Sequence, residues 1–243
     1  MHLSLRSAGL LIVCLLFVAS PLRAEMIISE IMYNPDSSEG RPQNREPNLV
    51  EWVELYNTGP KVVDLSGWYL QDEDGITAPL PNRTSIKPGQ AIVLIPGDQT
   101  VEAFRAAWGE GYDVYPLNNW TSPGIGGLAN SPSDTNEVLT LRDGKGRLID
   151  EVNYDDDDPW PTDSPDGPSI YLVPAALSAT AHDSGANLQR SEINHRGARA
   201  NETTEIYNGQ DIGSPGVVFT PEMDEQEAAA EDGDDNEDAG NAE

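Results

Sequence analysis

Residues 51–57 read Glu-Trp-Val-Glu-Leu-Tyr-Asn, and the turn sequence Asn-Thr-Gly-Pro spans residues 57–60. In an extended chain, Val53 and Leu55 point to the face opposite Glu54, because side chains alternate along a strand. β-branched and aromatic residues favour a strand, while Asn, Gly and Pro bend the chain that follows it. The stretch therefore predicts a short strand with one apolar face, ended by a turn.

Similar short runs recur along the chain, and the same turn-forming residues separate them. The predicted strands span residues 26–32, 50–57, 62–65, 68–71, 91–95, 138–142, 148–154 and 170–173. Residues 143–146 (Asp-Gly-Lys-Gly) join two of these runs and predict a hairpin. Only Val101–Trp108 predicts a helix, with Thr100 as its N-cap and Gly109 at its end. Many short strands with almost no helix predict a sandwich or a barrel.

The chain begins like a secretory signal peptide. Arg6 supplies the positive start, residues 9–19 form an apolar run, and residues 21–24 (Pro-Leu-Arg-Ala) resemble a cleavage site. The apolar run is too short for a stable membrane anchor, and no later segment is long and apolar enough to be one. We therefore expect residues 1–24 to be removed and the protein to be exported to the periplasm, the cell surface or the medium.

Cysteine content limits the chemistry of the mature chain. Cys14 is the only cysteine and lies within the predicted signal peptide. Disulfides and cysteine-ligated zinc sites are therefore excluded after export.

Acidic residues dominate the composition. The chain holds 42 Asp and Glu against 14 Lys and Arg, which gives a formal net charge of −28. Such a surface repels phosphate backbones, so nucleic-acid binding is disfavoured. Residues 222–243 contain no Lys, Arg or aromatic residue. They cannot bury enough apolar area to offset the entropy of ordering, so we expect a disordered acidic tail.

Five pieces of the chain, in this order, resemble the lamin tail domain family. They are residues 28–35 (ISEIMYNP), 51–57 (EWVELYN), 64–70 (DLSGWYL), 86–90 (IKPGQ) and the hairpin 139–150. The resemblance covers residues 26–154, and residues 213–216 (GSPG) also resemble the closing segment of exported bacterial members. It implies an immunoglobulin-like β-sandwich that serves as a binding or attachment module.

The chain as a whole is therefore expected to be all-β, a lamin-tail-type sandwich with long loops. We expect the sandwich domain over residues 25–154. A loop-rich extension over residues 155–221 closes or flanks it, and the disordered acidic tail follows over residues 222–243. Within the sandwich, Trp68 and Leu70 share a face and are expected in the core.

Two acidic turns are candidates for a metal site. Asp72 and Asp74 lie in the first turn, and Asp156 and Asp158 lie in the second. Clustered carboxylates can supply the oxygen ligands that Ca²⁺ prefers. Neither spacing matches an EF-hand loop, and a solvated acidic loop is the favoured interpretation of each turn. No cofactor is expected, and calcium is retained as a hypothesis for these four residues.

Other polar and aromatic residues give weaker indications of function. Residues 182–184 (His-Asp-Ser) have the residue types of a hydrolase triad, but triads assemble in space and the chain lacks a Gly-x-Ser-x-Gly elbow. Residues 190–199 form a basic stretch that could bind an anion or pair with the acidic body. Trp108, Trp120 and Trp160 could stack on a sugar or a partner protein, or pack beneath the loops.

These observations favour an exported, non-catalytic binding or adhesion module that recognises a protein or a surface polymer through its loops. One alternative is a metal-dependent hydrolase that uses the acidic loops. Another is a nucleic-acid-binding module, which the negative charge disfavours.

Overall fold

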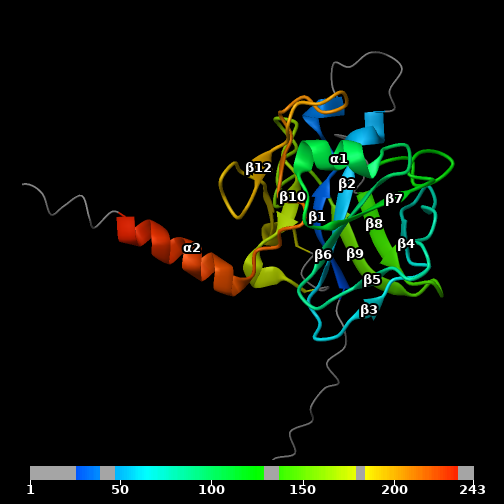
Figure 1. Ribbon diagram of the computed structural model, residues 1–243, viewed down its shortest axis with the longest axis horizontal. Helices are drawn as coiled ribbons and strands as arrows, with labels where there is room; N and C mark the ends of the chain where they lie inside the picture. The colour runs from blue at the N-terminus through cyan, green and yellow to red at the C-terminus, as the bar shows by residue number, and fades with distance from the viewer. Residues whose placement is uncertain (1–25, 39–46, 129–136, 179–183, 235–243) are drawn as a thin grey trace, which may run out of the picture.

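The structure is a computed structural model that describes residues 26–38, 47–128, 137–178 and 184–234 (Figure 1). The predicted signal peptide over residues 1–24 lies outside the described residues, as do His182 and Asp183 of the triad-like run. In the described part of the chain, no helix is both long and apolar enough to cross a membrane.

A six-stranded sheet forms one layer of the molecule, in the order β11-β10-β1-β2-β6-β7. Its strands are β1 (Met26–Met32), β2 (Trp52–Asn57), β6 (Ala91–Pro96), β7 (Asp113–Leu117), β10 (Ile170–Leu172) and β11 (Leu188–Arg190). Only β6 and β7 run parallel, and every other neighbouring pair in this sheet is antiparallel.

A three-stranded sheet in the order β4-β8-β9 forms the second layer. Its strands are β4 (Tyr69–Gln71), β8 (Glu137–Arg142) and β9 (Leu148–Tyr154). Two small ribbons complete the β-structure, β3 (Val63–Asp64) with β5 (Ser85–Ile86) and β12 (Arg199–Ala200) with β13 (Ile212–Gly213). The short 3-10 segments are η1 (Asp36–Ser38), η2 (Pro47–Val50), η3 (Pro174–Ala176) and η4 (Gly185–Asn187).

An apolar core lies between the two sheets. Val53 and Leu55 pair with Leu94 and Ile92 across β2 and β6, and all four side chains are fully buried. The facing sheet adds Leu70, Leu139, Leu141 and Val152 to the same cluster. Each such side chain stabilises the fold by about 1.5–3 kcal/mol through burial alone. The predicted sandwich is confirmed.

The opposite face of the six-stranded sheet carries a second, aromatic core. Helix α1 (Val101–Trp108) lies across this face and buries Phe104 and Trp108 against Trp52 of β2. The rings of Trp52 and Trp108 meet edge to face, with centroids 5.8 Å apart. Tyr207, from the C-terminal part of the chain, packs on both helix aromatics. The sheet is therefore buried on both faces.

Helix α1 begins and ends as the sequence predicts. The Thr100 side chain accepts a hydrogen bond of 3.1 Å from the backbone N–H of Ala103, and Gly109 ends the helix at a φ of 82°. Glycine adopts this left-handed conformation without the steric cost that a Cβ atom brings. The helix connects β6 to the parallel strand β7, as a crossover between parallel strands requires.

The strand predictions also hold in most places. Strands β1 and β9 span the predicted residues, and β2, β3, β4, β6, β8 and β10 differ from prediction by one or two residues at an end. Strand β7 was not predicted, because Pro116 interrupts its pattern, and the short strands β5, β11, β12 and β13 were not predicted either. That proline is tolerated because β7 ends the sheet, where a missing N–H breaks no ladder.

Residues 155–221 are built into the sheets. They supply β10, which pairs with β1, and β11, which pairs with β10. They also supply the β12–β13 ribbon and the segment over residues 213–219, which we call the closing segment. This part of the chain therefore completes the six-stranded sheet at one edge and covers its aromatic face.

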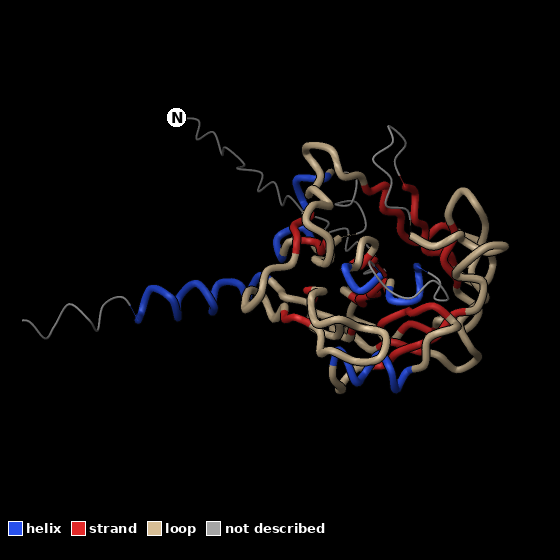
Figure 2. Tube along the Cα trace, turned by 90° about the horizontal axis from the view of Figure 1, so that it is seen from above, coloured by secondary structure: helices blue, strands red, loops and turns tan. Residues whose placement is uncertain are grey.

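The structure differs from the sequence prediction at the start of the acidic tail. Helix α2 (Pro221–Asp234) occupies residues expected to be disordered, and it extends away from the body (Figure 2). Ala, Glu and Gln are good helix formers, and Glu222 and Asp224 lie in the first turn, where negative charge is favourable. Asp224 also forms an ion pair of 2.7 Å with Arg196. Residues 235–243 of the predicted tail lie outside the described residues.

Candidate functional site

Two glutamates are buried side by side on the aromatic face of the six-stranded sheet. Glu30 of β1 is the register partner of Glu54 of β2, and each is almost completely inaccessible to solvent. A bulge between Ile28 and Glu30 inserts Ser29, whose hydroxyl donates a hydrogen bond of 2.6 Å to Glu54 Oε1. The bulge thus places a donor beside the pair as well as turning Glu30 toward Glu54.

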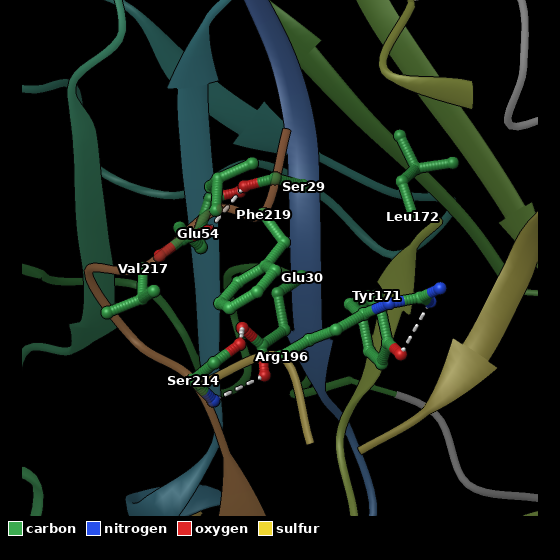
Figure 3. Close-up of a pocket in the computed structure, with 10 residues that line it drawn as sticks. Ser29, Glu30, Glu54, Tyr171, Leu172, Arg196, Ser214, Val217 and Phe219 are labelled. Carbon is green, nitrogen blue, oxygen red and sulfur yellow. Dashed lines mark hydrogen bonds between the residues drawn. The ribbon is translucent and has the colours of Figure 1, made fainter. Parts of the chain in front are cut away.

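Serine hydroxyls and the backbone of the closing segment supply the other donors to this pair, and Figure 3 shows Ser214 beside Glu30. Glu30 Oε1 accepts from the Ser169 hydroxyl and from the Ser214 backbone N–H at 2.9 Å. Glu30 Oε2 accepts from the Ser214 hydroxyl at 2.7 Å. Glu54 Oε2 accepts from the Gly216 backbone N–H at 2.7 Å. Both carboxyl groups therefore fasten the closing segment to the middle of the sheet.

The environment of the pair favours the protonated carboxyl. Burial and, after it, the neighbouring Glu30 raise the pKa of Glu54 to about 8, although the hydrogen bonds from Ser29 and Gly216 oppose the shift. Burial also raises the pKa of Glu30, although the hydrogen bonds from Ser169 and Ser214 oppose the shift. Two carboxylates this close cannot both ionise cheaply in a low dielectric. We infer that the pair keeps a proton at neutral pH.

The pair is enclosed. The space beside it measures about 10 Å³, and Val217, Val218 and Phe219 of the closing segment lie over it. A volume of this size holds about one water molecule. Perturbed carboxyl groups are often catalytic, but here no substrate can approach without displacing the closing segment. The arrangement favours a structural role for the two glutamates.

Arg196 connects strand β10 to helix α2. Its guanidinium donates to Asp224 and, at 3.1 Å, to the Tyr171 hydroxyl. The same group lies 5.9 Å from the centroid of the Tyr171 ring. At this position the basic stretch predicted from the sequence therefore pairs with an acidic group of helix α2 and with the aromatic Tyr171 of strand β10.

A second site is open. A groove of about 390 Å³ lies beside strand β11 and is lined by Pro159, Trp160, Pro161, Tyr171, Gly185, Ala186, Leu188, Gln189, Arg190, Glu192 and His195. Its lining combines a tryptophan and prolines with polar and charged side chains. Ligand sites commonly join an apolar wall to a few polar groups in this way.

The wall of the groove is held rigidly. The backbone N–H of Trp160 donates to the Asp157 carbonyl at 2.8 Å. A Cβ atom at Gly185 would lie 2.7 Å from Trp160, so only glycine permits this close approach. The Arg190 guanidinium donates to the carbonyls of Ser164 and Pro165, which fixes the adjoining loop. The groove is therefore preformed on one side.

The three tryptophans considered for recognition have different positions. Trp108 and Trp120 are buried, and the Trp120 indole donates to Glu51 at 2.7 Å. Both pack beneath the surface and cannot stack on a ligand. Trp160 is half-buried and lines the groove, so it alone of the three fits the recognition hypothesis.

The prediction that Trp68 and Leu70 lie in the core holds for Leu70, which is buried, while Trp68 is only half-buried against the core.

The four candidate calcium ligands lie in two separate turns. Asp72 and Asp74 follow β4, and Asp156 and Asp158 follow β9. Strand β8 lies between β4 and β9, so the two turns are separated by at least two strand spacings, roughly 10 Å. In the chain described, no three His, Cys, Asp or Glu side chains are grouped to hold a metal ion.

Asp72 caps its own turn. Its Oδ1 accepts from the backbone N–H groups of Asp74 and Gly75, and burial raises its pKa to about 6. Calcium binding at Asp72, Asp74, Asp156 and Asp158 stays a prediction. Calorimetric titration with millimolar Ca²⁺ that gives neither heat nor a change in melting temperature would exclude it.

Comparison with known proteins identifies the sandwich. The family model described as Lamin Tail Domain matches residues 20–156, more than half of the chain. The chain belongs to the lamin tail domain family. No curated protein matches it. The lamin tail domain has an immunoglobulin-like fold, which agrees with the two packed sheets seen here.

Part of the site lies beyond the segment that matches the lamin tail domain. Ser169, Ser214 and Gly216 bond to the paired glutamates, and β11 borders the groove, yet all of them follow residue 156. Glu54 was expected on the face opposite Val53 and Leu55, and it is. Its burial was not foreseen, because the segment that covers it lies 162 residues later. The GSPG sequence was the only signal for that segment.

Proposed function

We propose that this lamin tail domain protein is an exported, non-catalytic binding module that holds a protein or a surface polymer in the groove beside β11. The groove carries the proposal, because it is open and preformed. At about 390 Å³ it can receive part of a partner, whereas the space beside the paired glutamates is about 10 Å³.

The positions of the acidic groups support a non-catalytic role. The two carboxyl groups with the most strongly altered environment, Glu30 and Glu54, bond to the closing segment and not to the groove. In the groove itself, Glu192 and His195 lie among the lining residues, together with an arginine that is bonded to backbone carbonyls. Such a lining suits recognition through packing and hydrogen bonds.

Export is proposed from the sequence at the N-terminus. A positive start, an apolar run and a small residue at position 24 are the features of a cleaved signal. The acidic surface is compatible with a protein that stays soluble outside the cytoplasm.

The proposal is tested with a matched pair of aromatic variants. Trp160→Ala removes the groove wall, and Tyr115→Ala removes a half-buried ring on β7, at the opposite edge of the sheet. Purified wild type and both variants are used to capture partners from the cell-envelope fraction of the source. We expect a partner retained by wild type and Tyr115→Ala and lost by Trp160→Ala. Equal capture by all three proteins, or no enriched partner, would contradict the proposal.

A further inference from the structure

Strand β11 borders the groove and ends the six-stranded sheet as the structure describes it. Resting on the binding role proposed above, we propose that the groove takes an extended peptide that carries Lys or Arg and adds as a further strand to β11. Strand addition of this kind gives affinity through main-chain hydrogen bonds and selectivity through alternate side chains.

The groove runs along the edge of the sheet and not over one of its faces. Leu188 and Arg190 point to one face of β11 and Gln189 points to the other, because side chains alternate along a strand. All three residues line the groove. A ligand in it therefore lies against the edge of the strand, where an additional strand would pair.

The backbone of β11 offers hydrogen-bonding groups to that ligand. On either side of the β10–β11 ladder, Ser191 N–H donates to the Ser169 carbonyl and Val173 N–H donates to the Asn187 carbonyl, each at 2.9 Å. In an antiparallel pair such residues alternate with residues whose N–H and C=O point outward. Arg190 is one of these, so its N–H and C=O point away from β10. Leu188 is another, and its N–H bonds to Gly185 while its C=O points outward.

The other side of the groove suits apolar contact. Trp160 stands between Pro159 and Pro161, and its ring is fixed against Gly185. A rigid aromatic wall beside an open strand edge provides a surface for every second side chain of an added strand. Tryptophan also loses little conformational entropy on binding, which makes it an effective anchor.

Charge selects a basic peptide. Asp157 and Asp158 are exposed beside the tryptophan wall, and Glu192 is exposed in the lining. Arg190 and His195 also line the groove, but the Arg190 guanidinium is directed to the Ser164 and Pro165 carbonyls of the adjoining loop, and Arg196 pairs with Asp224. The net charge of −28 adds a long-range attraction for cations. The edge is therefore complementary to Lys or Arg side chains.

Binding is measured by fluorescence anisotropy of the full mature chain with a labelled Lys-Val-Lys-Val-Lys-Val-Lys peptide. Two matched peptides serve as controls, one with Glu in place of Lys and one with alternate backbone nitrogens methylated. We expect the Lys peptide to bind, more weakly as salt is raised, and both controls to bind at least about tenfold more weakly. Equal binding of the methylated peptide would overturn strand addition.

Two protein variants distinguish the contribution of the β11 strand edge from that of the Arg190 side chain. Arg190→Pro removes the outward N–H, and Arg190→Ala removes the same side chain but keeps that N–H. We expect about tenfold weaker binding for Arg190→Pro than for Arg190→Ala. If Arg190→Pro lowers the melting temperature sharply, the methylated peptide on wild-type protein decides the question alone.

Failure of this inference is distinguishable from failure of the proposed function. A polysaccharide or a folded protein that binds wild type but not Trp160→Ala, and binds Arg190→Pro and Arg190→Ala alike, would overturn strand addition and keep the binding role. If wild type and Trp160→Ala bind the Lys peptide and every envelope polymer equally, both proposals are wrong.

Discussion

The two faces of the six-stranded sheet are both buried, but by different chemistry. On the face toward the three-stranded sheet, Val53, Leu55 and their neighbours pack in an apolar core. On the aromatic face, Glu30 of β1 and Glu54 of β2 bond to serines and to the closing segment, and we call this part of that face the acidic face. The first face is covered by the three-stranded sheet. The second is covered by the closing segment, whose Ser214 lies 184 residues after Glu30 in the sequence.

This difference shows two ways to bury a sheet. On the apolar face, every side chain that is removed from water stabilises the folded state, in any orientation that packs. The acidic face gains little from removing carboxyl groups from water, so its stability depends on each donor being in place. We therefore expect the apolar face to respond to lost volume and the acidic face to respond to pH and to single hydrogen bonds.

The largest effect is expected for lost volume on the apolar face. Leu55→Ala should lower the free energy of unfolding by about 2–5 kcal/mol, because Leu55 is fully buried and the cavity cannot close completely. Urea unfolding measures this loss, and the same loss is expected at acidic and at mildly alkaline pH. Leu148→Ala, at a side chain that is 48% exposed, is the matched control and should change little. A strong pH dependence of the Leu55→Ala loss would break the comparison.

The next effect is the pH dependence contributed by Glu54. Between its ordinary pKa of 4.5 and its raised pKa of about 8, the native carboxyl keeps a proton that the unfolded chain has lost. The unfolded state then binds fewer protons, so the free energy of unfolding falls as pH rises through this window. The slope from one group is at most about 1.4 kcal/mol per pH unit.

Glu54→Gln keeps the shape of the protonated carboxyl but cannot ionise. We expect the variant to match wild type near pH 4.5 and to be more stable than wild type above about pH 8. Urea unfolding across a pH series gives the difference, with the exposed Glu151→Gln on β9 as the matched control. Wild-type and Glu54→Gln curves that stay parallel from acid to alkali would show that the pair does not hold a proton.

A smaller effect is expected from one hydrogen bond to the closing segment. Ser214→Ala removes the 2.7 Å bond from the hydroxyl to Glu30 Oε2 but keeps the backbone N–H bond. We expect a loss of about 1–3 kcal/mol, since the bond reaches a buried carboxyl. Thermal unfolding measures it against Ser184→Ala, at an exposed serine whose side chain caps no helix. An unchanged melting temperature for Ser214→Ala would mean that the Ser214 hydroxyl does not help Glu30 to hold the closing segment.

The smallest effect concerns the attachment of helix α2. Asp224→Ala removes the 2.7 Å ion pair with Arg196, and Asp224 is 36% exposed. Partly exposed pairs contribute about 0.2–1 kcal/mol and are screened by salt. We expect a difference of this size in low salt that shrinks in high salt, by urea unfolding. A loss of several kcal/mol would show that α2 belongs to the core.

The sequence predicts the apolar face and its strands well, because alternation and turn residues act locally. The alternation of Val53 and Leu55 predicts a buried face, and the turn residues Asp143 to Gly146 predict the hairpin that covers it. Thr100 and Gly109 similarly define both ends of α1. Each of these signals depends on residues within one turn or strand.

The acidic face could not be predicted in the same way. A glutamate that alternates with apolar residues looks solvent-exposed, and only the distant Ser214 and Gly216 make Glu54 and Glu30 buried. Strand β11 is three residues long and shows no period, so the groove beside it had no signal except Trp160. Long-range pairing of short segments leaves little trace in local sequence.

The central claim is that the closing segment seals the acidic face through the paired glutamates. Amide hydrogen exchange of Ser214 and Gly216 tests it most directly, because their N–H groups donate to Glu30 and Glu54. The account predicts that both amides exchange as slowly as those of β2 in the sheet centre, and faster in Glu30→Ala. Exchange of both amides at the rate of an unstructured chain in wild type would contradict it.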